Sequence, residues 1–303
     1  WKTFCDLMGY GDLLADPRYP DNNARVQQRA VLLPELRDAA QRVQGHAEAG
    51  RLDAEAVEAL FEHTIPIGRQ FGIVLVPSAG HHFEVATFRK DEAYADGRRP
   101  VGVVFSDMET DARRRDFTIN AIFEDPVAGT LVDLVDGRAD LERGVVRAVG
   151  DPRERFAEDH LRLLRAVRFS ARLGFPIHEQ TRLAMLEAAP TITRVSAERI
   201  GEELTRMLTE GRAKAAFEQL DATGLLVHVL PEITAMKGCE QSPDSHPEGD
   251  VFVHTMLCLG QLPAGCSEGL AWGTLLHDVS KPECAATRED GKRTFHGHTR
   301  DGA

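Results

Sequence analysis

Two ionisable side chains, Asp159 and Arg162, stand three residues apart in a segment with helical periodicity. Residues at i and i+3 project from the same side of a helix, so the pair sets an acceptor-only carboxylate beside a donor-only guanidinium. Adenine and cytosine each present an amino donor next to a ring-nitrogen acceptor, whereas guanine and uracil present the reverse. The pair could therefore select A and C without a template. The alternative is an aspartate favoured by the helix dipole, followed by solvated arginines.

The same predicted helix, residues 158–169, carries two stripes. Apolar side chains recur with helical spacing at Leu161, Leu164 and Val167. The cationic stripe consists of Arg162, Arg165, Arg168 and Arg172. Because no carboxylate follows in the sequence until Glu179, we expect an unneutralised face that attracts an anionic partner.

A second cationic cluster lies upstream, where three arginines at 113–115 precede Asp116 and Asn120. Together these side chains offer a bidentate grip on phosphates. Asp116 could orient an arginine, and Asn120 could reach a sugar or phosphate oxygen. A solvated surface run of arginines is the alternative.

Glu84 lies in the second of two predicted strands, 71–76 and 82–88, which flank a turn at 77–80 and predict a hairpin. Strand alternation places Glu84 on one face with Ala86 and Phe88. An acid there is either an edge residue facing water or a metal-binding carboxylate held on a rigid strand.

The C-terminal part contains His254, the adjacent pair His277-Asp278, His296 and His298. An adjacent His-Asp at a helix end, with another histidine about two helices earlier, can bring imidazole and carboxylate to one divalent metal ion. A structural His–Asp pair is the alternative.

Composition limits the kinds of protein that this chain can be. The chain has 303 residues, 42% hydrophobic content and a formal charge of -12, which indicates a soluble globular protein and argues against a generic nucleic-acid coat protein. We expect neither a membrane span nor a signal peptide. Five scattered cysteines without paired ligand spacing predict reduced thiols in the cytoplasm and disfavour a structural zinc site.

Breaks in the pattern predict four parts. Gly150-Asp151-Pro152 ends a region with strand signals, and a loop at 238–249 rich in Pro, Gly, Ser and Asp marks another boundary. We therefore expect a helical segment at 1–53, an α+β part at 54–149, a compact helical part at 150–238 and a final helical part at 239–303. Because the chain opens on Trp1 and stops at Ala303 within a motif-bearing region, we expect a fragment.

From about residue 54 onward the chain resembles the class II tRNA nucleotidyltransferases, which include the CCA-adding enzymes and bacterial poly(A) polymerases. The resemblance rests on ordered motifs at 64–68, 83–89, 114–121, 158–169 and 196–200. Residues 253–255 and 276–282 are similar to the HD domain that some members carry. Residues 1 to about 45 faintly resemble the C-terminal part of family III CoA transferases.

The resemblance implies a polymerase-β-like mixed-sheet nucleotidyltransferase head, incomplete here, followed by an all-α neck and body and a partial helical HD domain. Its partners would be tRNA, CTP and ATP, with no membrane and no stable protein partner. Asp159 and Arg162 would pair with the incoming base, with Arg165 and Arg168 on the same nucleotide-binding helix. The triphosphate and primer end would be bound by Arg114, Arg115, Asp116 and Asn120.

The resemblance also implies Mg²⁺ in the head, with Glu84 as the third catalytic carboxylate, and a divalent metal at His254, His277 and Asp278. Two-metal phosphoryl chemistry needs several carboxylates, and residues 1–53 contain no Asp-x-Asp motif. The last aspartate of an HD domain would lie beyond Ala303. Three hypotheses follow: a CCA-adding enzyme whose activity needs a completed head, a catalytically silent nucleotide- or tRNA-binding protein, and an HD-type phosphohydrolase.

Overall fold

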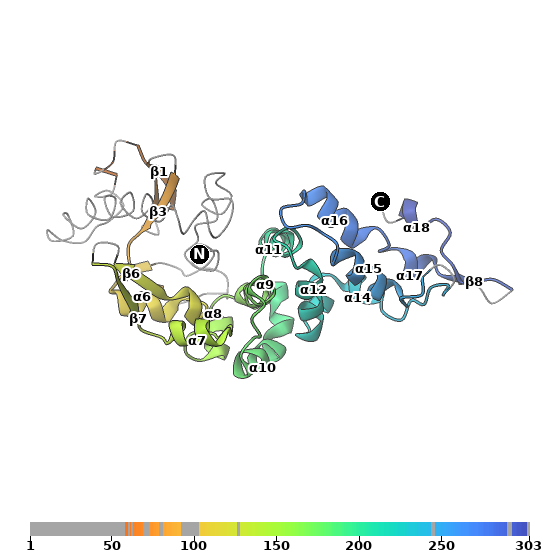
Figure 1. The fold of residues 1–303 in the computed structure, drawn as a ribbon, viewed down its shortest axis with the longest axis horizontal. Coiled ribbons are helices and arrows are strands. Elements are labelled where there is room, and N and C mark those ends of the chain that lie inside the picture. The colour runs from red at the N-terminus through yellow and green to blue at the C-terminus, as the bar shows by residue number, and fades with distance from the viewer. Residues whose placement is uncertain are drawn as a thin grey trace. The chain divides into compact units, whose positions relative to one another are not determined.

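The computed structural model describes residues 58–59, 61, 63–68, 73–78, 81–91, 103–125, 128–243, 246–289 and 293–301 (Figure 1). The predicted helical segment at 1–53 and most of the polar loop at 89–100 lie outside the described residues. The chain divides into two compact units, which meet in sequence between Leu141 and Glu142. Each unit is described by itself.

The first unit begins with a three-stranded antiparallel sheet in the order β1-β2-β3. Its strands are β1 (Ile65–Gly68), β2 (Ile73–Ser78) and β3 (His81–Ala86). The predicted hairpin is confirmed, because β2 and β3 pair with Leu75 opposite Glu84. Val74 and Val76 are buried and pack with Phe61 and Val85, so the alternating valines give this sheet its apolar face.

Two short hairpins and two helices complete this unit. They are β4 (Arg89–Asp91) with β5 (Val103–Phe105), α6 (Met108–Arg114), β6 (Ile122–Asp125) with β7 (Thr130–Asp133), and α7 (Gly137–Arg143). The sequence also predicts strands at about 117–124 and 130–135 that would extend the first sheet. This prediction is wrong for the described residues, where β6 and β7 form a sheet of their own.

The reason lies at Thr118–Asn120, which form a 3-10 turn instead of a strand. The Thr118 hydroxyl donates to Asp140 in α7 over 2.8 Å, and both side chains are buried. A Cβ at Gly137 would lie 2.2 Å from the Thr118 carbonyl oxygen. Glycine therefore lets α7 approach the turn closely, and this contact shortens the following strand.

The second unit is almost wholly helical and is built around α9 (Arg162–Leu173). Before α9 comes α8 (Pro152–Glu158), which is capped by Asp151. After it come α10 (Glu179–Ala188), the 3-10 helix η3 (Ala189–Arg194), α11 (Ala197–Thr209), α12 (Ala213–Ala222), α13 (Leu226–Val229) and α14 (Pro231–Ala235). The sequence predicts helices at 179–189, 196–210 and 213–223 in this part, and α10, α11 and α12 confirm them within one residue at either end.

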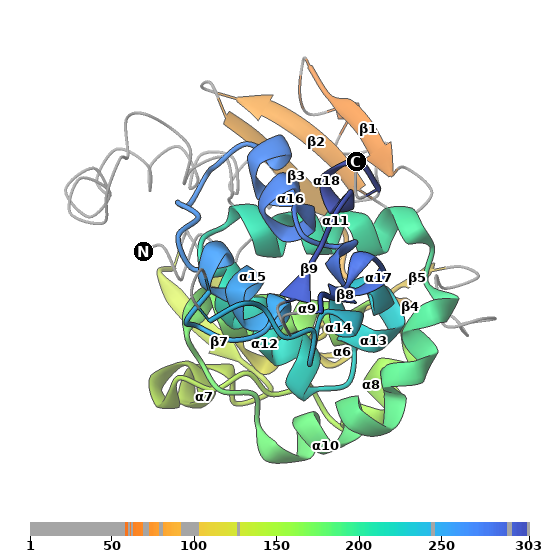
Figure 2. The ribbon, with the colours of Figure 1, turned by 90° about the vertical axis from the view of Figure 1, so that its right-hand side faces the viewer.

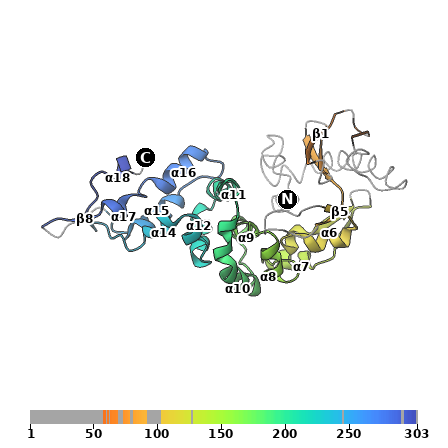
Figure 3. The ribbon, with the colours of Figure 1, turned by 180° about the vertical axis from the view of Figure 1, so that it is seen from behind.

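Helix α9 packs against α8, α11 and α12, which lie beside it in Figure 3. Leu163, Leu164 and Val167 are fully buried, so its apolar stripe forms the centre of this core. The helix ends at Gly174, whose left-handed φ of 71° lets the chain turn back.

The C-terminal part of this unit contains α15 (Val251–Leu259), α16 (Glu268–Leu276), α17 (Lys281–Cys284), β8 (Ala286–Thr287), β9 (Arg293–Thr294) and α18 (His298–Asp301). Figure 2 shows these elements in blue. Helix α15 packs on α12, and α16 packs on both α11 and α15. The described residues of the boundary predicted at 238–249 form no helix or strand, yet α12 and α15 on its two sides are in contact.

No helix in the described part of the chain is long and apolar enough to cross a membrane. The four cysteines of this part, Cys239, Cys258, Cys266 and Cys284, are free thiols.

The burial of α9 yields a prediction about stability. Leu164→Ala should lower the free energy of unfolding by about 2–5 kcal/mol, because it leaves a cavity in the core of the second unit. The matched control Leu183→Ala, at a leucine that is 45% exposed on α10, should change it by no more than about 0.5 kcal/mol. Urea denaturation followed by circular dichroism measures both, and equal losses would contradict the assignment of α9 to the core.

Candidate functional site

The structure interrupts the predicted helix 158–169 at Asp159. Helix α8 ends at Glu158, Asp159 is extended with φ −142° and ψ 106°, and α9 starts at Arg162. The Asp159 carbonyl accepts from the Arg162 backbone N–H over 3.0 Å, and Asp159 Oδ1 accepts from the Leu161 N–H over 3.1 Å. The expectation that Asp159 and Arg162 share a helical face is therefore wrong, since a turn closed by the aspartate itself joins them.

Each member of this pair is held by a side chain of opposite charge. Asp159 Oδ2 accepts from Arg199 Nη2 over 2.9 Å. Arg162 Nη1 donates to Glu158 Oε2 over 2.6 Å and to the Arg155 carbonyl over 3.0 Å. The side chains of Asp159 and Arg162 are only 19% and 9% exposed. The turn therefore presents a carboxylate and a guanidinium whose orientations are fixed before any ligand binds.

The expectation of an unneutralised arginine stripe is also wrong. Arg168 Nε donates to Glu203 Oε2 over 2.6 Å, and both side chains are 5% exposed. Arg172 Nη1 donates to Glu210 Oε2 over 3.2 Å. The neutralising carboxylates come from α11, 35 and 38 residues away in sequence.

Arg165 differs from these two arginines. Its guanidinium carbon lies 5.3 Å from the centre of the Phe169 ring, and its side chain is half-buried. The same ring is 4.4 Å from the guanidinium carbon of Arg168. The Phe169 ring therefore contacts the guanidinium groups of both arginines, and its π electrons stabilise both positive charges.

The contacts from α11 form a ladder along one side of that helix. Arg199 binds Asp159, Glu203 binds Arg168, and Glu210 binds Arg172. Arg199 and Glu203 are one helical turn apart, and Glu210 follows two turns after Glu203, so the three face the same neighbour. The docking of α11 on α9 therefore also fixes the carboxylate of Asp159.

In the first unit, Arg114 and Arg115 are organised by the buried carboxylate of Asp111. Arg114 Nη2 lies 2.6 Å from Asp111 Oδ1, and Arg115 Nε lies 3.1 Å from Asp111 Oδ2. Asp111 Oδ1 also accepts from the Arg89 backbone N–H over 3.2 Å. By contrast, Arg113 pairs with Glu109 on the surface, where both side chains are more than 60% exposed.

Asp116 and Asn120 lie together beyond α6. Asn120 Nδ2 donates to Asp116 Oδ1 over 3.0 Å, and the Phe117 N–H donates to the same oxygen. Arg115 Nη1 donates to the Asn120 carbonyl over 2.7 Å, and its guanidinium carbon is 4.7 Å from the Phe123 ring centre. The structure thus brings together the four candidate phosphate-binding residues predicted in this segment.

Glu84 is exposed and lies on β3, an outer strand of the three-stranded sheet in the described residues. Within the described part of the chain it belongs to no group of three or more candidate metal ligands. The described residues therefore do not provide the carboxylates that a two-magnesium site needs.

The structure brings together His254, His277 and Asp278. His277 Nε2 lies 3.2 Å and His254 Nε2 3.9 Å from Asp278 Oδ2. Lys281 Nζ lies 2.7 Å from that same oxygen, and His298 Nε2 lies 3.7 Å from Asp278 Oδ1. The imidazoles therefore lie around the carboxylate of Asp278, which is buried.

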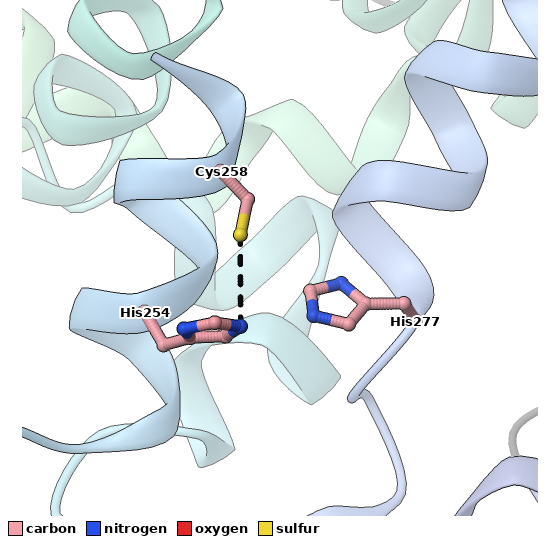
Figure 4. Close-up of side chains that lie close together, drawn as sticks. All are labelled: His254, Cys258 and His277. Carbon is pink, nitrogen blue, oxygen red and sulfur yellow. Dashed lines mark hydrogen bonds between the residues drawn. The ribbon is translucent and has the colours of Figure 1, made fainter. Parts of the chain in front are cut away.

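Two further residues extend this cluster. Cys258 Sγ lies 3.6 Å from His254 Nε2 (Figure 4). Glu248 Oε1 lies 2.6 Å from His254 Nδ1 and 2.9 Å from His246 Nδ1.

Neighbouring charges and hydrogen bonds shift the pKa values of several groups in this cluster. Hydrogen bonds from His246 and then His254 lower the pKa of Glu248 to about 2. Burial acts to raise the pKa of Asp278, but hydrogen bonds and charges from His277 and Lys281 outweigh it and hold this pKa well below its usual range. The hydrogen bond with Asp278 raises the pKa of His277, and burial raises that of the Cys258 thiol.

Sequence reasoning missed four residues that organise these sites. Asp111 stands three and four residues before Arg114 and Arg115, and Cys258 stands four residues after His254, so helical spacing could have indicated both. Arg199 and Glu203 act across helices on partners 40 and 35 residues away, and no local pattern indicates such contacts.

Comparisons with known proteins identify the class. Residues 46–147 match the family model "Poly A polymerase head domain", and residues 174–237 match "Probable RNA and SrmB- binding site of polymerase A". The fold and these two matches define a polymerase-type nucleotidyltransferase head joined to a helical RNA-binding part.

Curated relatives narrow this class. A CCA-adding enzyme of Leuconostoc mesenteroides is 43% identical over 165 residues, which are 54% of this chain and 41% of that protein. A CCA-adding enzyme of Lactobacillus delbrueckii subsp. bulgaricus is 37% identical over 217 residues, or 69% of this chain and 54% of that protein. The chain spans about half the length of these relatives.

A solved structure agrees. The CCA-adding enzyme of Bacillus stearothermophilus in complex with CTP superposes with a TM-score of 0.59 and 31% identity, over 68% of this chain and 56% of that one. The chain belongs to the class II tRNA nucleotidyltransferase family of the CCA-adding enzymes, as its motifs predict.

The buried pair between α9 and α11 generates a prediction. Glu203→Ala should lower the free energy of unfolding by about 3–5 kcal/mol, because it leaves the guanidinium of Arg168 buried without its carboxylate. The double variant Arg168→Met with Glu203→Met should lose far less, since no buried charge remains. Thermal and urea denaturation measure both variants.

The control is Glu187→Ala, which removes the exposed partner of Arg153. It should leave the denaturation midpoint unchanged, because exposed ion pairs contribute little. A Glu203→Ala variant as stable as this control would show that the pair does not fix α11 on α9.

Proposed function

We propose that this chain is the base-selecting and tRNA-binding portion of a tRNA 3′-terminal nucleotidyltransferase, which adds C and A from CTP and ATP and releases pyrophosphate. Family membership supports the class of reaction. The particular substrates are inferred from the chemistry of Asp159 and Arg162 and from the relatives' described activity. The free thiols are consistent with work in the cytoplasm.

The turn at Asp159 is the observation that carries the proposal. Asp159 and Arg162 are three residues apart at this turn, and Arg199 and Glu158 hold the acceptor-only carboxylate and the donor-only guanidinium respectively. Cytosine and adenine complement that pair through a ring nitrogen that accepts and an amino group that donates, while uracil and guanine oppose it. Because both side chains are largely buried and are held by groups of this chain, their discrimination between bases would need no template strand.

Arg114 and Arg115 supply the second element of the proposal, a grip on the triphosphate. Asp111 orients both guanidinium groups, whose planar donors match phosphate oxygens. Asn120 donates one amide proton to Asp116 and is proposed to bind a sugar or phosphate oxygen at the primer end. Arg165 and Arg168 belong to the same nucleotide-binding neck, where Arg168 acts by holding α11.

Magnesium supplies the two-metal chemistry of phosphoryl transfer in this family when bound. Glu84 is the carboxylate proposed to contribute to it. The described residues do not complete such a site.

A catalytically silent nucleotide- or tRNA-binding protein is the second candidate, favoured by the lack of an Asp-x-Asp motif in residues 1–53. Labelled CTP and ATP with a tRNA lacking its 3′ terminus separate the two. Incorporation by this chain would refute the silent protein, whereas nucleotide binding without incorporation would refute enzymatic activity of this chain.

Base selection can be tested apart from catalysis. Asp159→Ala should remove the preference for CTP and ATP over UTP and GTP, measured by equilibrium binding. A discriminating hydrogen-bonded contact contributes about 1–3 kcal/mol, so the preference should fall by about tenfold or more. Glu187→Ala, an exposed acid on α10, should keep it. Unchanged discrimination in Asp159→Ala would remove the pairing hypothesis.

A further inference from the structure

The C-terminal helices carry a cluster of possible metal ligands that is separate from the turn at Asp159. His254 and Cys258 occur four residues apart on one face of α15, and His277 stands at the C-terminal cap of α16. One ligand atom from each lies within 4.8 Å of the other two (Figure 4). We propose that Cys258 is a metal ligand here, joining His254, His277 and Asp278 in a site for a borderline transition-metal cation such as Zn²⁺.

The two imidazoles are already oriented for this role. His254 Nδ1 faces the Glu248 carboxylate at 2.6 Å, and His277 Nδ1 faces the Thr274 carbonyl at 2.9 Å. Both oxygens accept hydrogen bonds, so each Nδ1 is assigned a proton. Each Nε2 can then bind a metal ion, for which His277 Nε2 gives up its hydrogen bond to Asp278. Metal-binding histidines in proteins are held in this way, with carboxylate or carbonyl partners on the other ring nitrogen.

The spacing of the donors fits a small tetrahedral ion. Bonds of about 2.0 Å to nitrogen and about 2.3 Å to sulfur place such donors about 3.5 Å apart in tetrahedral geometry. Cys258 Sγ and His254 Nε2 are 3.6 Å apart, and His277 Nε2 and Asp278 Oδ2 are 3.2 Å apart. The 3.9 Å between His254 Nε2 and Asp278 Oδ2 closes with a small side-chain shift.

Lys281 also contacts Asp278, with Nζ 2.7 Å from Oδ2. Gln241 Oε1 accepts from the same ammonium over 2.8 Å, so Lys281 is fixed beside the carboxylate. A carboxylate oxygen has two lone pairs and can accept from Lys281 while it binds a metal ion. Lys281 offsets part of the negative charge that Asp278 and a Cys258 thiolate would carry.

The donor set decides which cation fits. Thiolate and imidazole favour zinc and its neighbours cobalt and nickel, whereas magnesium and calcium require oxygen ligands. Binding would release the Cys258 thiol proton to solvent as the sulfur–metal bond forms. The site therefore has a different metal preference from a carboxylate site for magnesium.

Cobalt substitution of the full chain tests the role of Cys258. Co²⁺ added to metal-free protein should produce the near-ultraviolet sulfur-to-cobalt charge-transfer band, which Zn²⁺ should abolish and excess Mg²⁺ should not. Cys258→Ala should lose the band and bind Co²⁺ at least about tenfold more weakly. Cys266→Ala, at a cysteine outside the cluster, should behave like the unsubstituted chain.

The variant Glu248→Gln tests the orientation of the His254 ring separately from metal binding by the Cys258 sulfur. It should keep the band but weaken Co²⁺ binding by about tenfold, because the sulfur remains while His254 loses its charged partner. Cobalt binding without the band, or a band that persists in Cys258→Ala, would overturn the proposal.

Alkylation of the unsubstituted chain provides a test that does not depend on whether a variant folds. Zn²⁺ should slow alkylation of Cys258 by iodoacetamide and leave the alkylation rate of Cys266 unchanged, as read by mass spectrometry of the digested protein. Equal alkylation of Cys258 with and without Zn²⁺ would also overturn the proposal.

Discussion

The buried ion pair between Arg168 and Glu203 is the constraint on which the helical unit depends. A guanidinium that is only 5% exposed is strongly unfavourable without its carboxylate, so α11 must dock on α9 with Glu203 at that point. Arg199 lies one helical turn before Glu203 on α11, so the same docking brings Arg199 into contact with Asp159. A stability requirement in the core thereby sets the position of the carboxylate proposed to read the base.

The same principle recurs in the first unit. Asp111 is buried, and its carboxylate holds Arg114 and Arg115 together with the Arg89 backbone. Arginines that looked like a solvated run are therefore fixed in direction. The arginines proposed to bind phosphate and the arginine proposed to bind the base are held in the same way. In each case an acidic side chain of this chain orients the guanidinium group toward a future anionic partner.

The histidine cluster uses the reverse arrangement, in which acids and carbonyls orient imidazoles. Glu248 and the Thr274 carbonyl fix the two ring nitrogens, and the remaining nitrogens face Cys258 and Asp278. The helices that carry the cluster pack on α11 and α12. The turn at Asp159 and the donor cluster thus depend on the same helical core, although their chemistries differ.

Local pattern determined much of this protein. The β2–β3 hairpin, the helices α10 to α12 and the family motifs follow from alternation, periodicity and residue type within short windows. Tertiary structure alone decided which charges meet. The break at Asp159 and the neutralisation of Arg168 depend on Arg199 and Glu203, which lie 40 and 35 residues from their partners. Such contacts arise from helix packing, and no short window of sequence contains both partners.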